Sequence, residues 1–202
     1  MKIFVNALSI FRIIASFAII PTLMYQWYWL TFVLYALAGF SDFFDGWLAK
    51  KYKVTSKLGG VLDHIGDKFL VVNTMIMLAA MLPVWFIVVP IIIMIARELY
   101  VSGLREFMGT QKIEMPVSSK YGYFAMARIK TFLQMVAVGA FLLMFCLGTL
   151  ISLDVIGGWL FTFLIYLAPK VGIWGLWISL AASLWSAGQY TITFAEKYKK
   201  LK

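Results

Sequence analysis

Charged residues are scarce in this sequence. Of its 202 residues, 13% are charged and 63% are hydrophobic, whereas a typical soluble domain contains about 25% charged residues. Such a composition leaves too few polar side chains to cover a water-exposed surface, which excludes an ordinary soluble globular domain. The composition therefore predicts an integral membrane protein.

Cysteine and histidine are nearly absent. The single cysteine, Cys146, has no partner for a disulfide or a thiolate metal site. The single histidine, His64, directly follows Asp63, and adjacent residues of a helix point about 100° apart. We therefore expect His64 to face away from the neighbouring carboxylates rather than to bind a metal with them.

Long apolar segments, in contrast, recur along the whole chain. A helix needs about 20 mostly apolar residues to cross the roughly 30 Å hydrocarbon core of a bilayer. Six segments meet this requirement, so residues 1–202 are expected to form one all-α membrane domain with six transmembrane helices. Their approximate limits are Asn6 to Met24, Trp27 to Ala49, Leu58 to Leu82, Val84 to Arg105, Tyr121 to Ile151 and Gly172 to Ala195. The shorter apolar segment Val155 to Leu167 is expected to lie in the interface or to extend the fifth connection.

Basic residues are concentrated in alternate connections. Lys2 precedes the first span, lysines fill the second connection, arginines and lysines mark the fourth, and Lys202 ends the chain, whereas the first and third connections have no charge. Since basic residues favour the cytoplasmic side, both termini are predicted to be cytoplasmic. The net charge of +9 then indicates contact with anionic lipid headgroups rather than with nucleic acid.

Four of the nine acidic residues lie in or beside two consecutive apolar segments. Asp42 and Asp45 are three residues apart and Asp63 and Asp67 are four apart, so each pair lies on one helix face, at a similar depth. Ionisable groups at this depth are costly unless they are paired or solvated, and four close carboxylates would recruit cations. Because Mg²⁺ commonly binds carboxylates together with substrate phosphates, the pattern predicts a metal site and a phosphate-bearing substrate.

The segment from Asp42 to Asp67 resembles the signature of the CDP-alcohol phosphatidyltransferase family, which reads D-x2-D-G-x2-A-R, eight residues, then G-x3-D-x3-D. Every spacing matches. Lys50 replaces the usual arginine and lacks its planar fork, and His64 stands where the phosphatidylglycerophosphate synthase subfamily usually has proline. The resemblance implies a six-helix membrane enzyme that displaces CMP from a CDP-linked lipid with the hydroxyl of an acceptor alcohol.

The resemblance also implies roles for individual residues. Asp42, Asp45 and Asp63 would bind metal, expected to be two Mg²⁺ or Mn²⁺ ions, while Asp67 would approach the metal and act as general base. These roles are chemically reasonable, because metals offset charge on a diphosphate and a carboxylate accepts a hydroxyl proton. The substrate-binding positions implied by the signature region are Gly46, Lys50, Ser56 and Gly59.

Three further regions, 96–107, 130–135 and 184–190, resemble phosphatidylglycerophosphate synthases in particular. They imply CDP-diacylglycerol and glycerol 3-phosphate as substrates, a homodimer, and an inner-membrane enzyme whose site faces the cytoplasm. An acceptor phosphate requires a cationic pocket, for which Arg105 and Lys130 are the preferred ligands. Arg97 and Arg12 could serve the site or pair with acidic neighbours, and Tyr190 is selected by resemblance alone.

Two alternatives remain open. A sister transferase could use another acceptor and make cardiolipin, phosphatidylserine or phosphatidylinositol phosphate. A cation channel or transporter would explain the carboxylates but not Gly46, Ala49 and Gly59 at fixed spacing, although either glycine alone could equally reflect ordinary helix packing. An intramembrane prenyltransferase is disfavoured, because its aspartate motifs lie on separate, distant helices.

Overall fold

The computed structural model describes residues 2–52, 57–110 and 123–199, and within them the side chains outside 2–6, 42–52, 57, 58, 60, 61, 63, 64 and 123–129. These residues form six α-helices and no strand, which confirms the predicted all-α fold. The helices are α1 (Lys2–Met24), α2 (Tyr28–Tyr52), α3 (Lys57–Met81), α4 (Trp85–Thr110), α5 (Tyr123–Ser152) and α6 (Trp159–Lys199).

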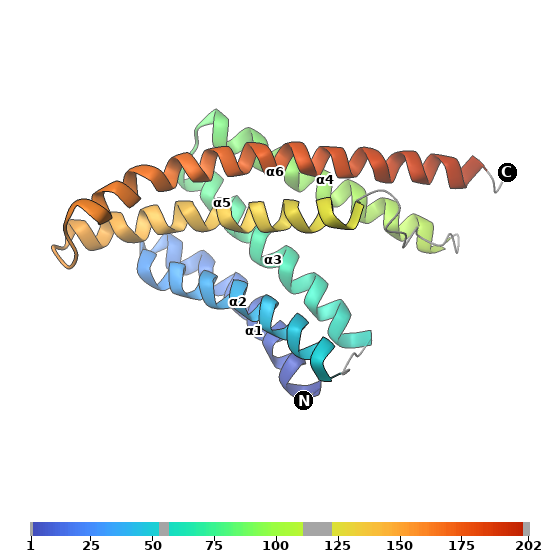
Figure 1. Ribbon diagram of the computed structural model, residues 1–202, viewed down its shortest axis with the longest axis horizontal. Helices are drawn as coiled ribbons and strands as arrows, with labels where there is room; N and C mark the ends of the chain where they lie inside the picture. The colour runs from blue at the N-terminus through green and yellow to red at the C-terminus, as the bar shows by residue number, and fades with distance from the viewer. Residues whose placement is uncertain (1, 53–56, 111–122, 200–202) are drawn as a thin grey trace.

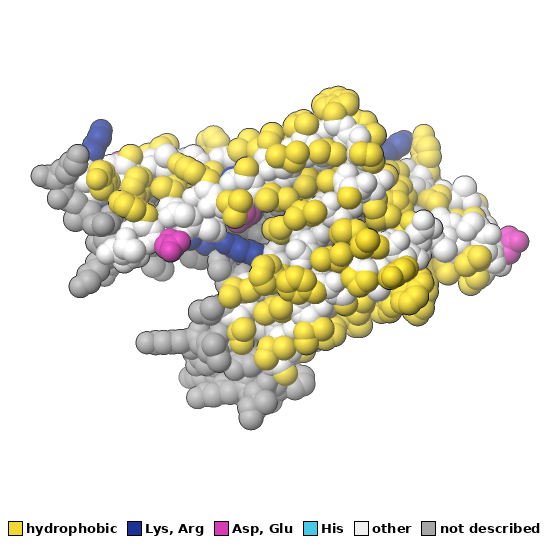
Figure 2. Space-filling model, turned by 180° about the vertical axis from the view of Figure 1, so that it is seen from behind, with side chains coloured by type: hydrophobic (Ala, Val, Ile, Leu, Met, Phe, Trp, Pro, Cys, Tyr) yellow, Lys and Arg dark blue, Asp and Glu magenta, His cyan; other side chains and the backbone are white. Residues whose placement is uncertain are grey.

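Four helices, α1, α4, α5 and α6, contain described stretches that are long and apolar enough to cross a membrane. In α2 the described apolar stretch, Tyr28–Ser41, is shorter. Large hydrophobic side chains such as Ile14, Trp85, Leu99 and Trp174 are more than half exposed on the outer helix faces, and hydrophobic atoms cover most of the face in Figure 2. Together with the helices, this surface identifies a multi-pass membrane protein.

The helices form two groups that diverge from each other (Figure 1). In one group α5 and α6 run side by side over their length, and α4 packs on α6. In the other group α1 packs against both α2 and α3. Contacts of α2 and α3 with α5, and of α3 with α4, join the two groups. The shared core contains buried residues from several helices, including Ile19, Leu70, Met94, Phe141 and Leu176.

The turn between α1 and α2 shows how a helix ends without a glycine. Gln26 adopts a left-handed conformation with φ of 61°, and the Trp27 amide donates to the Thr22 carbonyl at 2.8 Å, so carbonyls at the end of α1 are satisfied. The Thr31 hydroxyl bonds to the Thr22 hydroxyl at 2.9 Å in the buried interior. This short connection forces α2 to run back along α1.

The sixth helix differs from the sequence prediction. The segment Val155 to Leu167 is predicted to lie in the interface or extend the connection, but from Trp159 onward it is part of one 41-residue helix that continues through Pro169 to Lys199. Pro169 is tolerated within the helix, since neighbouring helices can compensate for a lost backbone bond. At about 1.5 Å per residue, α6 is roughly twice as long as the hydrocarbon core is thick.

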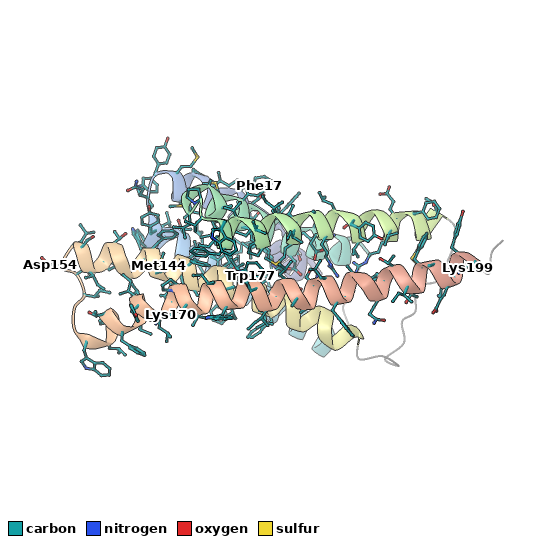
Figure 3. All side chains as sticks on the ribbon, turned by 90° about the horizontal axis from the view of Figure 1, so that it is seen from above. Phe17, Met144, Asp154, Lys170, Trp177 and Lys199 are labelled. Carbon is teal, nitrogen blue, oxygen red and sulfur yellow. The ribbon has the colours of Figure 1, made fainter. Side chains whose placement is uncertain are left out.

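Alternate connections lie at the same end of the molecule. The turns α1–α2, α3–α4 and α5–α6 lie toward the left of Figure 1, whereas α4 and α6 end at the right. Asp154, in the last of these turns, and Lys199, near the end of α6, occupy opposite ends in Figure 3. The helix ends that flank basic segments thus lie at one end of the molecule, and the turns with few charges lie at the other. The side of the membrane that each end faces stays a prediction.

Candidate functional site

A cavity of about 170 Å³ lies between α3, α4, α5 and α6. It contains six ionisable side chains other than tyrosine, four cationic and two acidic. Lys and Arg side chains gather in the hollow between the two helix groups, which is visible in Figure 2. The charged lining residues are Asp67 and Lys68 from α3, Arg97, Glu98 and Arg105 from α4, and Lys130 from α5.

The two ends of the cavity differ in polarity. Arg105 and Tyr190 line the end nearer to the C-terminus of α4, while Val71, Met75 and Met94 line the other end, nearer to the α3–α4 turn. Since about 1.5 Å separates successive residues along a helix, Met75 lies about 12 Å beyond Asp67 along α3. A ligand can therefore place an anionic group at one end and contact an apolar wall at the other.

Asp67 pairs with an arginine from a neighbouring helix. The Arg12 guanidinium of α1 donates through Nη1 to Asp67 Oδ1; the Arg12 side chain is 0% exposed and that of Asp67 is 34% exposed. Gly66 packs beside this pair, where an added Cβ would lie 3.4 Å from Arg12 Cδ, an ordinary van der Waals contact. Arg12 thus neutralises part of the charge of Asp67 from behind, while the carboxylate still reaches the cavity.

Glu98 joins two buried cations. Arg97 Nη1 donates to Glu98 Oε1 at 2.7 Å, and Lys130 Nζ donates to the same oxygen. Arg97 also donates through Nε to the Ser183 carbonyl of α6 at 2.9 Å. The side chains of Arg97 and Lys130 are only 5% and 8% exposed, so the shared carboxylate offsets charges that water barely reaches.

A second cationic pair lies nearer to the end of α4. Arg105 Nη2 donates to the Tyr190 hydroxyl of α6 at 2.7 Å, and the Arg105 guanidinium carbon lies 5.0 Å from the centre of the Tyr190 ring. Lys68 Nζ donates to the Ser102 hydroxyl at 2.6 Å. These bonds restrict the orientation of Arg105 and Lys68 and hold their charges at the cavity.

The structure brings five of the predicted site residues together, since Asp67, Arg97, Arg105, Lys130 and Tyr190 all line this cavity. They come from four helices and are separated by up to 123 positions in the sequence. Arg97 lines the cavity and pairs with an acidic neighbour, Glu98, while its service to the site stays a prediction.

The other predicted positions either do not line the cavity or have side chains outside the described residues. Gly59 lies in α3, eight residues before Asp67, and is not among the residues that line the cavity. Asp42, Gly46 and other signature residues are helical, but their side chains lie outside the described residues. That group consists of Asp42, Asp45, Gly46 and Lys50 in α2 and Asp63 and His64 in α3, while Ser56 lies outside the described residues altogether.

Lys68 and Glu98 are site residues that the sequence prediction misses. Both are ionisable residues within otherwise apolar segments, which is the signal that selects the aspartates. In the sequence Glu98 is conspicuous only as a neighbour of Arg97, and Lys68 only as a neighbour of Asp67. Applying the same criterion to every charge in the apolar segments would have found both.

The sequence is similar to one protein-family model and to several known proteins that share one name. The family model described as CDP-alcohol phosphatidyltransferase matches residues 2–185. The CDP-diacylglycerol–glycerol-3-phosphate 3-phosphatidyltransferase of Rickettsia bellii is 39% identical over 151 residues, which cover 71% of this chain and 79% of that protein. The protein of the same name from Haemophilus influenzae is 34% identical over 142 residues, covering 67% and 72%.

A third protein of that name, from Sodalis glossinidius, is 31% identical over 188 residues, which cover 91% of this chain and 90% of the relative. This similarity extends over nearly the whole of both chains. With a family model that matches all but the last 17 residues and the first one, the chain belongs to the CDP-alcohol phosphatidyltransferase family.

Proposed function

We propose that this protein transfers the phosphatidyl group from CDP-diacylglycerol to glycerol 3-phosphate, which yields phosphatidylglycerol phosphate and CMP. The three relatives are named for this pair of substrates. The structural observation that favours a phosphorylated acceptor is the charge of the cavity, where four cations face two carboxylates. This excess of two positive charges matches a phosphate dianion, whereas a neutral alcohol would leave it uncompensated.

In this proposal Arg105 and Lys130 bind the acceptor phosphate. Arg105 is oriented by its bond to Tyr190, and Lys130 by its bond to Glu98. Arginine can form two parallel hydrogen bonds with a phosphate, and lysine adds a point charge. Because Arg97 bonds to both Glu98 and the Ser183 carbonyl, its main contribution is to hold Glu98 in place for Lys130.

We further propose that Asp42, Asp45, Asp63 and Asp67 bind divalent metal, either Mg²⁺ or Mn²⁺ and expected to be two ions. The donor chemistry fits, because hard cations of this kind take carboxylate oxygens, and the described backbone places each pair of aspartates within one helix, three or four residues apart. Bound metal would offset the negative charge of the diphosphate and of the CMP leaving group.

Asp67 is proposed as the general base. Its side chain lines the cavity and is one-third exposed, so the acceptor hydroxyl can reach it. Asp67 takes the proton from the C1 hydroxyl as that oxygen forms a bond to the β-phosphorus of CDP-diacylglycerol. The bond from this phosphorus to the bridging oxygen breaks, and CMP leaves with the bonding electron pair. Arg12 holds the carboxylate in position during this transfer.

The proposal places the protein in the inner membrane, as a homodimer, with the cavity open toward the cytoplasm. The distribution of basic residues supports this orientation: the cavity includes Arg105, five residues before the end of α4, and Lys130, seven residues after the start of α5. A soluble acceptor would enter from the cytoplasm, and the lipid substrate would arrive laterally with its acyl chains in the bilayer.

The test uses purified full-length protein with CDP-diacylglycerol in mixed micelles and measures CMP release with glycerol 3-phosphate, serine, phosphatidylglycerol or inositol 1-phosphate. Glycerol 3-phosphate should support the fastest release and yield phosphatidylglycerol phosphate. Faster release with another acceptor would assign a sister transferase. Cation flux in vesicles without any CMP release would instead favour a channel or transporter.

Metal dependence is tested in the same assay. EDTA should abolish CMP release, and excess Mg²⁺ or Mn²⁺ should restore it, since the aspartates need the cation to hold the diphosphate. As an independent measure, Mg²⁺ should raise the melting temperature of the wild type more than that of Asp67→Asn. Full activity after dialysis against EDTA would refute the metal proposal without refuting the substrates.

A further inference from the structure

Buried hydroxyls in the described part of this protein have hydrogen-bond partners, with the exception of two serines. Ser16, Ser41 and Thr74 are buried within helices, and each donates to a carbonyl three or four residues earlier, at the same distance of 2.7 Å. Ser183 and Ser186 of α6 are 1% and 2% exposed, yet neither hydroxyl has a hydrogen-bond partner among the described residues. A buried polar group without a partner typically costs about 1–3 kcal/mol, so these two positions need an explanation.

The two serines differ in what they face. Ser186 lines the cavity, whereas Ser183 is not among the lining residues. Another residue of the cavity lining also has an unsatisfied donor: Arg105 Nε is buried and has no partner in the described part of the chain, although Nη2 of the same guanidinium bonds to Tyr190. Tyr190 lies one helical turn after Ser186 on α6. Two unsatisfied donors thus belong to residues that line the same cavity.

Unsatisfied donors on a cavity wall indicate the chemistry of the missing partner. Arg105 Nε can only donate, and a serine hydroxyl can donate as well as accept. A group that satisfies both must accept two hydrogen bonds, and the surplus of cations around the cavity favours an anionic group. A phosphate group has both properties, and it can accept from both of these donors at once.

We propose that Ser186 is a substrate-binding residue whose hydroxyl donates to a phosphate oxygen of the acceptor, beside the bond from Arg105 Nε. The inference rests on the proposed function and assigns α6 a direct part in acceptor binding. The phosphate of glycerol 3-phosphate and the diphosphate of CDP-diacylglycerol share this chemistry. The acceptor is favoured, because Ser186 lies one turn before Tyr190, whose hydroxyl holds the arginine proposed to bind the acceptor phosphate.

Ser186→Ala tests the assignment, with Ser183→Ala as the matched control on the same helix. We expect Ser186→Ala to raise KM for glycerol 3-phosphate by roughly tenfold or more, as the loss of a hydrogen bond to a charged group predicts. KM for CDP-diacylglycerol should change by less than about twofold, within the range of a neutral substitution. The melting temperature should not fall, because the hydroxyl has no partner to lose, and Ser186→Thr should restore much of the affinity.

Ser183→Ala should leave both KM values and the melting temperature unchanged. An unchanged KM for glycerol 3-phosphate in Ser186→Ala would overturn the assignment, as would an equal rise in Ser183→Ala. A selective rise in KM for CDP-diacylglycerol would move the hydroxyl to the diphosphate and refute acceptor binding. The proposed function fails separately, if the wild type shows no CMP release that depends on glycerol 3-phosphate.

Discussion

The Arg12 guanidinium of α1 forms an ion pair with the Asp67 carboxylate of α3, and it does so from a fully buried position. The pair joins two helices through residues that are 55 positions apart in the sequence. The pair keeps an otherwise costly charge stable within an apolar helix, and we expect Arg12 to position the carboxylate proposed as general base.

Replacing Arg12 by alanine should destabilise the fold through Asp67. We expect Arg12→Ala to lower the free energy of unfolding by about 1–3 kcal/mol. This is less than the roughly 3–5 kcal/mol for a fully buried pair, since one-third of Asp67 is exposed and solvent screens its charge. Denaturant unfolding in detergent measures the change. In the Asp67→Asn background the same substitution should cost less; equal costs in both backgrounds would show that the pair does not couple.

Asp67→Asn should nearly abolish transfer, because asparagine keeps the shape of the side chain but cannot accept the hydroxyl proton. General-base catalysis typically contributes about 100- to 10,000-fold, so kcat should fall by at least about 100-fold. CMP release measures the effect at a temperature where circular dichroism shows the variant to be folded, because the loss of the partner of buried Arg12 should lower its melting temperature. Normal turnover in this variant would refute the assignment of the base.

Glu98→Ala should destabilise the ligand-free protein and make it more responsive to anions. Lys130 and Arg97 lose the carboxylate that they share, which should cost about 2 kcal/mol, since Glu98 is partly exposed. Glycerol 3-phosphate should then raise the melting temperature more than in the wild type, because its phosphate supplies the missing negative charge. Glu106→Ala, at an exposed position of the same helix, is the control. A ligand shift equal to that of the wild type would contradict this role of Glu98.

Gly172→Ala should weaken the contact between α5 and α6. A Cβ at position 172 would lie 2.5 Å from Phe141 Cε2, and Phe141 is buried with 1% exposure, so the ring has little room to move. Overpacking of this kind costs typically about 1–3 kcal/mol. Gly188→Ala is the matched control on the same helix, since a Cβ added there would meet no atom of another helix within 4 Å. Similar melting temperatures for both variants would mean that α5 and α6 are not closely packed at Gly172.

Local sequence pattern determines much of this fold. Apolar runs predict six helices and an all-α fold, and the structure confirms both. The spacing of Asp42, Asp45, Asp63 and Asp67 within two helices follows from helix geometry alone. The predicted start of the last helix is wrong: the segment Val155 to Leu167 is too short to span a membrane by itself, but packing of α6 along α5 joins most of it to the following helix.

The sequence by itself determined the helices, the clustered aspartates and the family, since these depend on residues close together in the chain. The tertiary structure decided which charges meet. Glu98 joins Arg97 to Lys130, Arg105 meets Tyr190, and Ser186 faces their cavity without a partner among the described residues. These contacts connect residues up to 85 positions apart, and no local periodicity encodes them. They arise because packing of the apolar helix faces brings four helices around one polar space, where each charge must find a partner or a ligand.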